Sequence, residues 1–342
     1  MGAKNYSNEF LCPDLHAACT SLAAMAARAT RSASRKARAT EAVATGPLGA
    51  LSHDELGVIF DGLADPLQPV VAVALSSTCL GLRTPLGALL EVLKERHERA
   101  VALCRKMEGA LCNAQKLSCA VLQVADWLNW TSKGVTADDM ATLGMILRTR
   151  GLPRLHALHL GINIFGESGM QALCEGLGPG AAPSLRMLSL GVNHFGPVGA
   201  EALATALRGG AMPNLATLGI SDNPIGNQGV AALASPLRKR PALKELVLSR
   251  CEIGDEGVAS LVANLGKDDF KVLTRLFLNG NEITDASCDT LARALDAGAF
   301  PALLMLNVNN NRNNNNNNII LNVNDAARQT VQDALTRAIA RR

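Results

Sequence analysis

Residues that could perform acid–base, nucleophilic or metal chemistry are few in this chain, and they do not form recognisable sets. Of the six histidines, His156 and His159 are close in sequence, but three residues apart on a strand they point to opposite faces. The nine cysteines include no Cys-x-x-Cys pair, and no glycine-rich phosphate loop or Gly-x-Ser-x-Gly turn occurs. We therefore expect no catalytic residue, no metal site and no cofactor, and a protein that is not an enzyme.

Side chains suited to protein recognition recur from residue 127 onward. Tryptophan, methionine, arginine and phenylalanine are types that dominate the binding energy of protein interfaces. The spacing described next turns six candidate partner-binding residues to one side: Trp127, His159, Met187, Glu245, Arg275 and Phe277. Gly161, Gly191 and Gly219 would keep the middle of that surface shallow, so that a partner's helix or tail could approach closely. The alternative is that these are solitary exposed residues without a role.

The elements that must position these residues follow from a repeated spacing. The pattern Leu-x-x-Leu-x-Leu-x-x-Asn begins at Leu155 and returns at residues 185, 215, 243, 273 and 303, at intervals of 30, 30, 28, 30 and 30. Leu-x-Leu is the alternation of a strand, whereas pairs such as Leu173 and Leu177 have helical spacing. Each unit is predicted to be a strand, a turn and a helix, and a weaker first copy begins near Ala125.

The predicted turn between strand and helix has its own markers. An asparagine such as Asn163 can both donate and accept hydrogen bonds, and so satisfies backbone groups exposed where the chain leaves the strand. Cys251 takes the place of this asparagine in one unit. Glycine pairs such as Gly166 and Gly169 permit tight backbone geometry at the approach to each helix.

These residues closely resemble the ribonuclease-inhibitor-like class of leucine-rich repeats over roughly residues 125–302. The resemblance implies an α/β solenoid shaped as a horseshoe, with parallel strands on the concave face and helices on the convex face. It also implies a protein partner bound on the concave face or its rim. Members of the class include inhibitors, innate sensors, Ran GTPase activators and ubiquitin-ligase adaptors, so the fold alone does not choose a function.

Residues 48–83 resemble a second family, the F-box. In that family an Ile-Phe-x-x-Leu helix docks on the small adaptor subunit of a cullin-type ubiquitin ligase. The matching docking residues here are Leu56, Ile59, Phe60 and Leu63, although His53 or Asp54 stands near the expected proline and Leu82 replaces an aromatic residue. The same segment also fits an ordinary helical cap, because Ser52 and Glu55 form a capping box before an apolar helix stripe.

The chain is predicted to have five segments. These are a disordered basic tail (residues 1–47), an F-box-like helical module (48–90), a helical linker (91–124), the repeats (125–302), and a degenerate last repeat with an asparagine-rich insert and a capping helix (303–342). The tail is either a targeting signal or merely basic. The capping helix should place Val331, Leu335 and Ile339 on one face, while Arg337 and Arg341 suit its dipole.

Charge and composition narrow the class of partner. Residues 1–47 hold six Lys and Arg against three acids, which leaves 27 of each sign for the remainder, so we expect no nucleic-acid partner. No apolar stretch approaches the roughly 18 residues of a membrane span, so we expect no membrane partner, and the scattered cysteines favour a cytoplasmic or nuclear location. We expect a protein–protein interaction module, acting as the substrate-recognition adaptor of a cullin-type ubiquitin ligase. The alternative is a leucine-rich-repeat scaffold or GTPase regulator without ligase association.

Overall fold

The computed structural model describes residues 64–70, 73, 87–107, 117–266, 268–313, 321–322 and 325–341. The chain forms two compact units, of which the second comprises Pro66–Gln68 and Glu95–Arg342 and contains all the repeats. The F-box-like residues Leu56, Ile59, Phe60 and Leu63 lie outside the described residues.

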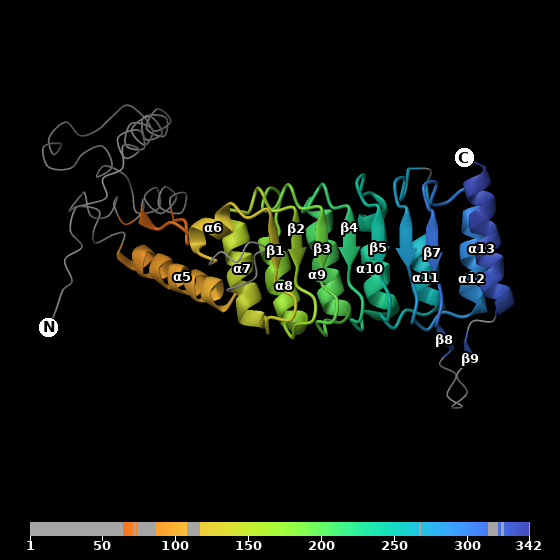
Figure 1. Cartoon of the computed structure of the whole chain (residues 1–342), viewed down its shortest axis with the longest axis horizontal. Coiled ribbons are helices and arrows are strands. Elements are labelled where there is room, and N and C mark those ends of the chain that lie inside the picture. The colour runs from red at the N-terminus through yellow and green to blue at the C-terminus, as the bar shows by residue number, and fades with distance from the viewer. Residues whose placement is uncertain are drawn as a thin grey trace, which may run out of the picture. The chain divides into compact units, whose positions relative to one another are not determined.

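Seven short strands form one parallel sheet in chain order (Figure 1). They are β1 (Trp127–Asn129), β2 (Ala157–His159), β3 (Met187–Ser189), β4 (Thr217–Gly219), β5 (Glu245–Val247), β6 (Arg275–Phe277) and β7 (Met305–Asn307). A separate antiparallel pair, β8 (Arg312–Asn313) and β9 (Leu321–Asn322), follows the last of them.

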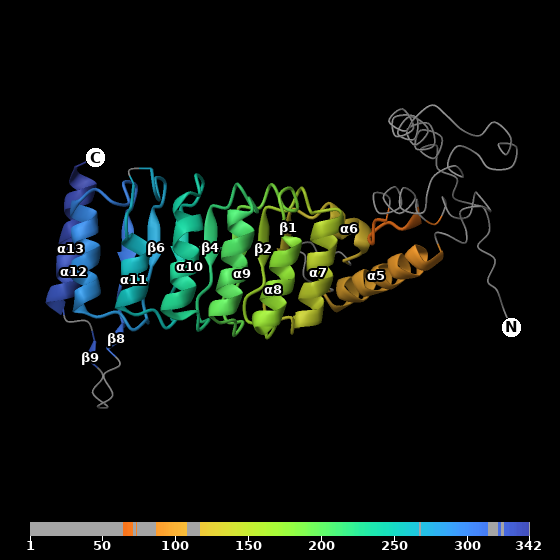
Figure 2. The same cartoon turned by 180° about the vertical axis from the view of Figure 1, so that it is seen from behind.

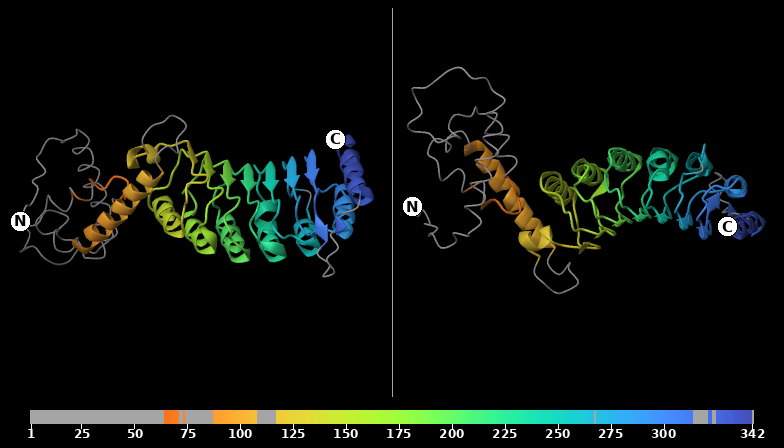
Figure 3. Two further views of the ribbon diagram at one scale, coloured as in Figure 1. Left: turned by 60° about the horizontal axis from the view of Figure 1, so that its bottom comes forward. Right: turned by 90° about the horizontal axis from the view of Figure 1, so that it is seen from above.

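A helix follows nearly every strand and returns the chain to the start of the next. These helices are α7 (Ala137–Thr149), α8 (Gly166–Gly176), α9 (Pro197–Arg208), α10 (Gly226–Arg238), α11 (Asp255–Val262), α12 (Asp285–Asp296) and α13 (Asp325–Ala340). Figures 1 and 2 show the repeats from opposite sides, and in Figure 3 the helices cover one side of the sheet while the strands line the other. The predicted α/β repeat solenoid is confirmed, including its weak first copy.

The core lies between the sheet and the helices and is built from equivalent residues of successive repeats. Leu158 pairs in register with Leu188, which pairs with Leu218, and all three are fully buried. The middle residue of each strand faces this core, whereas the flanking residues do not, as period-two alternation requires. Phe165 and Phe195 add a stacked aromatic pair at 6.5 Å between ring centroids. The leucine at the middle of each strand therefore sets the register between neighbouring strands and also forms the core.

The asparagine after each strand bonds the backbone of its own repeat and of the preceding one. The side-chain amide of Asn163 donates to the carbonyl oxygens of Trp130 and Leu160, and its Oδ1 accepts from the backbone N–H groups of Lys133 and Val135. Asn163 is 4% exposed, so these bonds are made away from water. The predicted role of the asparagine is confirmed.

The loops after β1 to β5 alternate between two conformations. Gly134, His194 and Glu252 have positive φ in one set, whereas the equivalent Pro224 cannot reach positive φ. In that repeat Gly226, two residues later, has φ +60° instead, and Gly166 does the same after Ile164. The fixed φ of Pro224 thus accounts for the second loop conformation in that repeat.

Among the loops after β1 to β5, only those in the first conformation donate to the side-chain oxygen of the next asparagine. Asn223 accepts from the backbone of the first-conformation loop at residues 193–195, but the Oδ1 of Asn193 faces a second-conformation loop and has no partner among the described residues. Cys251 also follows a second-conformation loop, and its thiol needs only to donate, to the carbonyl oxygens of Ile220 and Ser249. This explains why cysteine replaces asparagine there.

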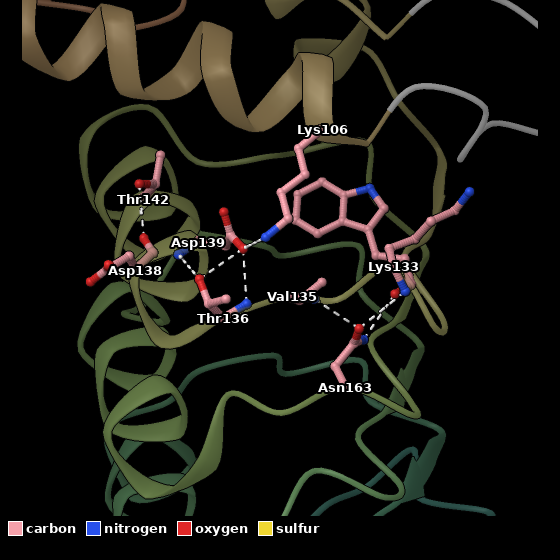
Figure 4. A network of polar contacts seen from close by, with 9 residues as sticks. Lys106, Lys133, Val135, Thr136, Asp138, Asp139, Thr142 and Asn163 are labelled. Carbon is pink, nitrogen blue, oxygen red and sulfur yellow. Dashed lines mark hydrogen bonds and ion pairs between the residues drawn. The ribbon is translucent and has the colours of Figure 1, made fainter.

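Two helices precede the first repeat in the described part of the chain. They are α5 (Gly87–Lys106) and α6 (Cys119–Gln123). Helix α5 runs without a break across residues 90 and 91, where the sequence predicts a boundary between two segments. At the end of α5, Lys106 forms an ion pair with Asp139 of α7 (Figure 4). Asp139 also accepts from the backbone of Thr136 in a capping box, which joins the start of α7 to α5.

Helix α13 packs on α12 at the other end of the repeats. Val331 and Leu335 are buried as predicted, but Ile339 is 39% exposed, so the apolar face of α13 ends one turn earlier than the spacing suggests. Arg337 and Arg341 do more than complement the helix dipole, because both bond the Asp296 carboxylate of α12, Arg337 through two contacts of 2.8 and 3.1 Å.

Candidate protein-binding face

The outward side chains of the seven strands form a surface that we call the strand face. It consists of the first and third residue of each strand from β1 to β7, and Figure 3 shows that the helices lie on the opposite side of the sheet. The register aligns these side chains in two rows, because each strand pairs with the next at equivalent residues. All six predicted partner-binding residues lie on this face, but in separate groups rather than in one cluster.

The first group is an aromatic pair on β1 and β2. The rings of Trp127 and His159 meet edge to face, with 5.6 Å between their centroids and an interplanar angle of 82°. Both side chains are half-buried. Burial lowers the pKa of His159, so the imidazole is neutral near pH 7 and offers a hydrogen-bonding edge next to an indole surface.

The second group joins β5 and β6. Arg275 donates to the Glu245 carboxylate at 2.7 Å, and this hydrogen bond, with the opposite charge, raises the pKa of Arg275. Phe277 projects from the same side of β6 as Arg275, since the intervening Leu276 is buried. Arg275 is exposed as predicted, whereas Phe277 is only half-buried, because it lies in register between the strands that carry Val247 and Asn307.

The middle of the strand face carries mostly small side chains. Met187 is 37% exposed, and the next strand ends in Gly219, where an added Cβ atom would meet nothing within 4 Å. Gly161 and Gly191 have a different role from the one predicted. They follow the strands, and a Cβ on Gly191 would lie 3.2 Å from the carbonyl oxygen of Ser221, so they allow neighbouring turns to approach closely.

An apolar group at the edge of the strand face was not predicted. Ile162 and Ile164 are 56% and 69% exposed in the loop after β2. Ile162 and its equivalent Val192 both have φ +57°, a backbone region in which a β-branched residue is a genuine outlier. The equivalent positions in other repeats hold Ser132, Asp222 and Gly280, and this contrast in residue type was the available sequence signal.

Neither a metal cluster nor a membrane helix is found in the described part of the chain. No group of three or more His, Cys, Asp or Glu side chains is arranged to hold an ion there. Within the same ranges, no helix combines the length and apolar composition needed to cross a bilayer.

The comparisons with known proteins concern the repeats. A family model described as "Leucine Rich repeat" matches residues 181–204, 211–234 and 241–262, which cover β3 to β5 and most of the helices that follow them. No curated protein matches the chain. Solenoids of such repeats present an extended surface that serves as a protein–protein interaction module.

Proposed function

We propose that this leucine-rich-repeat solenoid binds a protein partner on its strand face. The observation that carries the proposal is that the strand face has large side chains at both ends and small residues between them. The contacts would be made by Trp127, His159, Met187, Glu245, Arg275 and Phe277. A partner helix or tail lying across β3 and β4 would approach the backbone closely over Gly219, while its ends meet the two groups.

The apolar edge supports the same proposal. Exposed isoleucine in a strained backbone conformation costs stability, and strain of this kind is concentrated at sites with a function. Ile162 and Ile164 lie three and five residues after His159, so an extended partner segment bound at Trp127 and His159 would reach them within about three to five residue lengths.

The binding test uses partners recovered by affinity purification and then measured with purified components. Phe277→Ala and Arg275→Ala should each weaken the complex about tenfold, the loss typical of a hot-spot side chain. Arg293→Ala is the matched control, because Arg293 is exposed on α12 and bonds only within its own helix. Equal affinities of the Phe277, Arg275 and Arg293 variants would place the partner elsewhere.

We further propose that the protein is the substrate-recognition adaptor of a cullin-type ubiquitin ligase. The support is the F-box-like sequence of residues 48–83, joined to a solenoid whose strand face is available for a substrate. In that arrangement Leu56, Ile59, Phe60 and Leu63 dock on the small adaptor subunit.

A pull-down with the purified small adaptor subunit tests this role. The double variant Leu56→Asp/Phe60→Asp should abolish capture, whereas Val198→Asp, a charge placed on a 50% exposed valine of α9, should leave capture unchanged. Capture by the double variant, or no capture by the unmodified chain, would leave the protein as a scaffold or GTPase regulator without ligase association.

A further inference from the structure

A pocket on the helix side of the solenoid collects three arginine side chains. It has a volume of about 280 Å³ and is lined by residues of α5, α7 and α8. Arg96 and Arg99 come from one face of α5, since residues three apart on a helix are neighbours, and Arg148 comes from the last turn of α7. We call this site the arginine pocket. It shares no residue with the strand face.

Two glycines bring α7 and α8 into close contact at the arginine pocket. Gly144 of α7 and Gly176 of α8 both line it, and the helices approach so closely that a Cβ atom on Gly176 would collide with the carbonyl oxygen of Gly144. A Cβ atom on Gly144 would collide with the backbone of Ala172 in the same way. The two glycines therefore let α7 and α8 pack backbone to backbone, and this part of the pocket wall is backbone rather than side chain.

The charges around the arginine pocket are not balanced within the described residues. Arg99 pairs with Glu95 of its own helix at 2.7 Å. Arg96 and Arg148 take part in no ion pair in the described part of the chain, and Glu175, which also lines the pocket, pairs with neither of them there. The guanidinium groups of Arg96 and Arg148 therefore line the same pocket without a carboxylate partner in that part of the chain. This arrangement favours the binding of an anion from solution.

We propose that the arginine pocket binds a phosphate group in its doubly charged form. The planar fork of a guanidinium matches phosphate oxygens through two parallel hydrogen bonds. Arg96 and Arg148 supply two positive charges without a carboxylate partner among the described residues, which matches the charge of a dianion. The volume lies just below the roughly 300 Å³ at which pockets for small organic ligands begin, so the pocket accommodates one phosphate group with a short attached chain. The source is either a free phosphate compound or a phosphorylated side chain of a partner.

The test measures binding of inorganic phosphate and of a short phosphoserine peptide to the full chain by calorimetry in chloride buffer. The unphosphorylated peptide is the ligand control. Arg96→Ala/Arg148→Ala should weaken binding of the phosphorylated ligand by at least about tenfold, because two charge-assisted contacts are removed. Arg208→Ala is the matched protein control. Arg208 occupies the position of Arg148 two repeats later, in the last turn of α9, but pairs with Glu201 and lies outside the pocket.

Binding of inorganic phosphate supports the proposal with a free phosphate compound as the source, and binding of the phosphopeptide alone supports it with a phosphorylated partner. If neither ligand shows saturable binding, the proposal is overturned. Equal affinities of the double variant and Arg208→Ala also overturn it. Arg148→Glu provides a second check, because this exposed residue can be replaced without disturbing the core, and unchanged phosphate affinity in that variant would contradict the assignment.

Discussion

At the scale of single residues, Asn223 and Asn193 look equivalent in sequence but make different hydrogen bonds. The Oδ1 of Asn223 accepts from two backbone N–H groups, whereas the Oδ1 of Asn193 accepts from none among the described residues. Asn223→Cys should therefore lower the free energy of unfolding by about 2 kcal/mol more than Asn193→Cys, since only the former leaves buried N–H groups unsatisfied. Urea denaturation of both variants measures the difference. Equal losses of unfolding free energy in the two variants would show that the two loop conformations do not differ in stability.

Ile162 and Ile164 form another matched pair. Asparagine tolerates the left-handed backbone region far better than a β-branched residue, so Ile162→Asn should raise the free energy of unfolding by about 1 kcal/mol. Ile164→Asn removes a similar exposed apolar side chain at a residue without positive φ, and should leave stability nearly unchanged. Both variants should bind the partner more weakly. A loss of stability in Ile162→Asn would contradict the strain argument.

The buried thiols should be inert while the chain is folded. Burial raises the pKa of Cys251 and of Cys174 to about 12, and that of Cys288 to about 11. Iodoacetamide at pH 8 should leave these three residues unmodified in the folded protein and modify them in urea, as peptide mass spectrometry would show. Because these thiols keep their protons longer in the folded chain, stability should also fall as the pH rises above their ordinary value of 9.0. Rapid labelling of Cys251 in the folded protein would contradict this expectation.

At the scale of elements, α13 covers the end of the solenoid through a short apolar face. Leu335 is 4% exposed and Ile339 is 39% exposed, although both lie on the face that helical spacing defines. Leu335→Ala should therefore lower the free energy of unfolding by about 2–5 kcal/mol, as for other buried leucines, while Ile339→Ala should have little effect. Thermal unfolding of the two variants tests this order. Equal shifts would mean that α13 packs along its whole length.

The elements themselves were largely predictable from sequence, because leucine spacing reports burial directly. The first repeat, predicted to begin near Ala125, is present, since Leu128 and Trp130 are fully buried on and just after β1. The end of the α13 apolar face could not be predicted, because spacing defines a helix face but not how far the neighbouring element extends along it.

At the scale of the whole molecule, the position of the strand face was predictable but its chemistry was not. Period-two alternation places Arg275 and Phe277 on one face whatever their neighbours are. That Arg275 is paired with Glu245 depends on the register of two strands 30 residues apart. The arginine pocket was missed for a similar reason, because Arg96 and Arg148 come together only through tertiary packing, which no local pattern reports.

The loop alternation also limits how such a chain can grow or shrink during evolution. A loop of the first kind, such as that at Asn193, needs an asparagine in the following repeat, while a loop of the second kind accepts Cys251 there. Deleting one unit of 30 residues between β3 and β5 would place Cys251 beside the loop at Asn193 and leave two N–H groups without an acceptor. Deleting any other single unit would keep an asparagine after each loop that needs one, because asparagine follows both kinds of loop in this chain. The repeat that contains β4 is therefore the one whose loss this chain should tolerate least, although none of its residues is among the six proposed contacts.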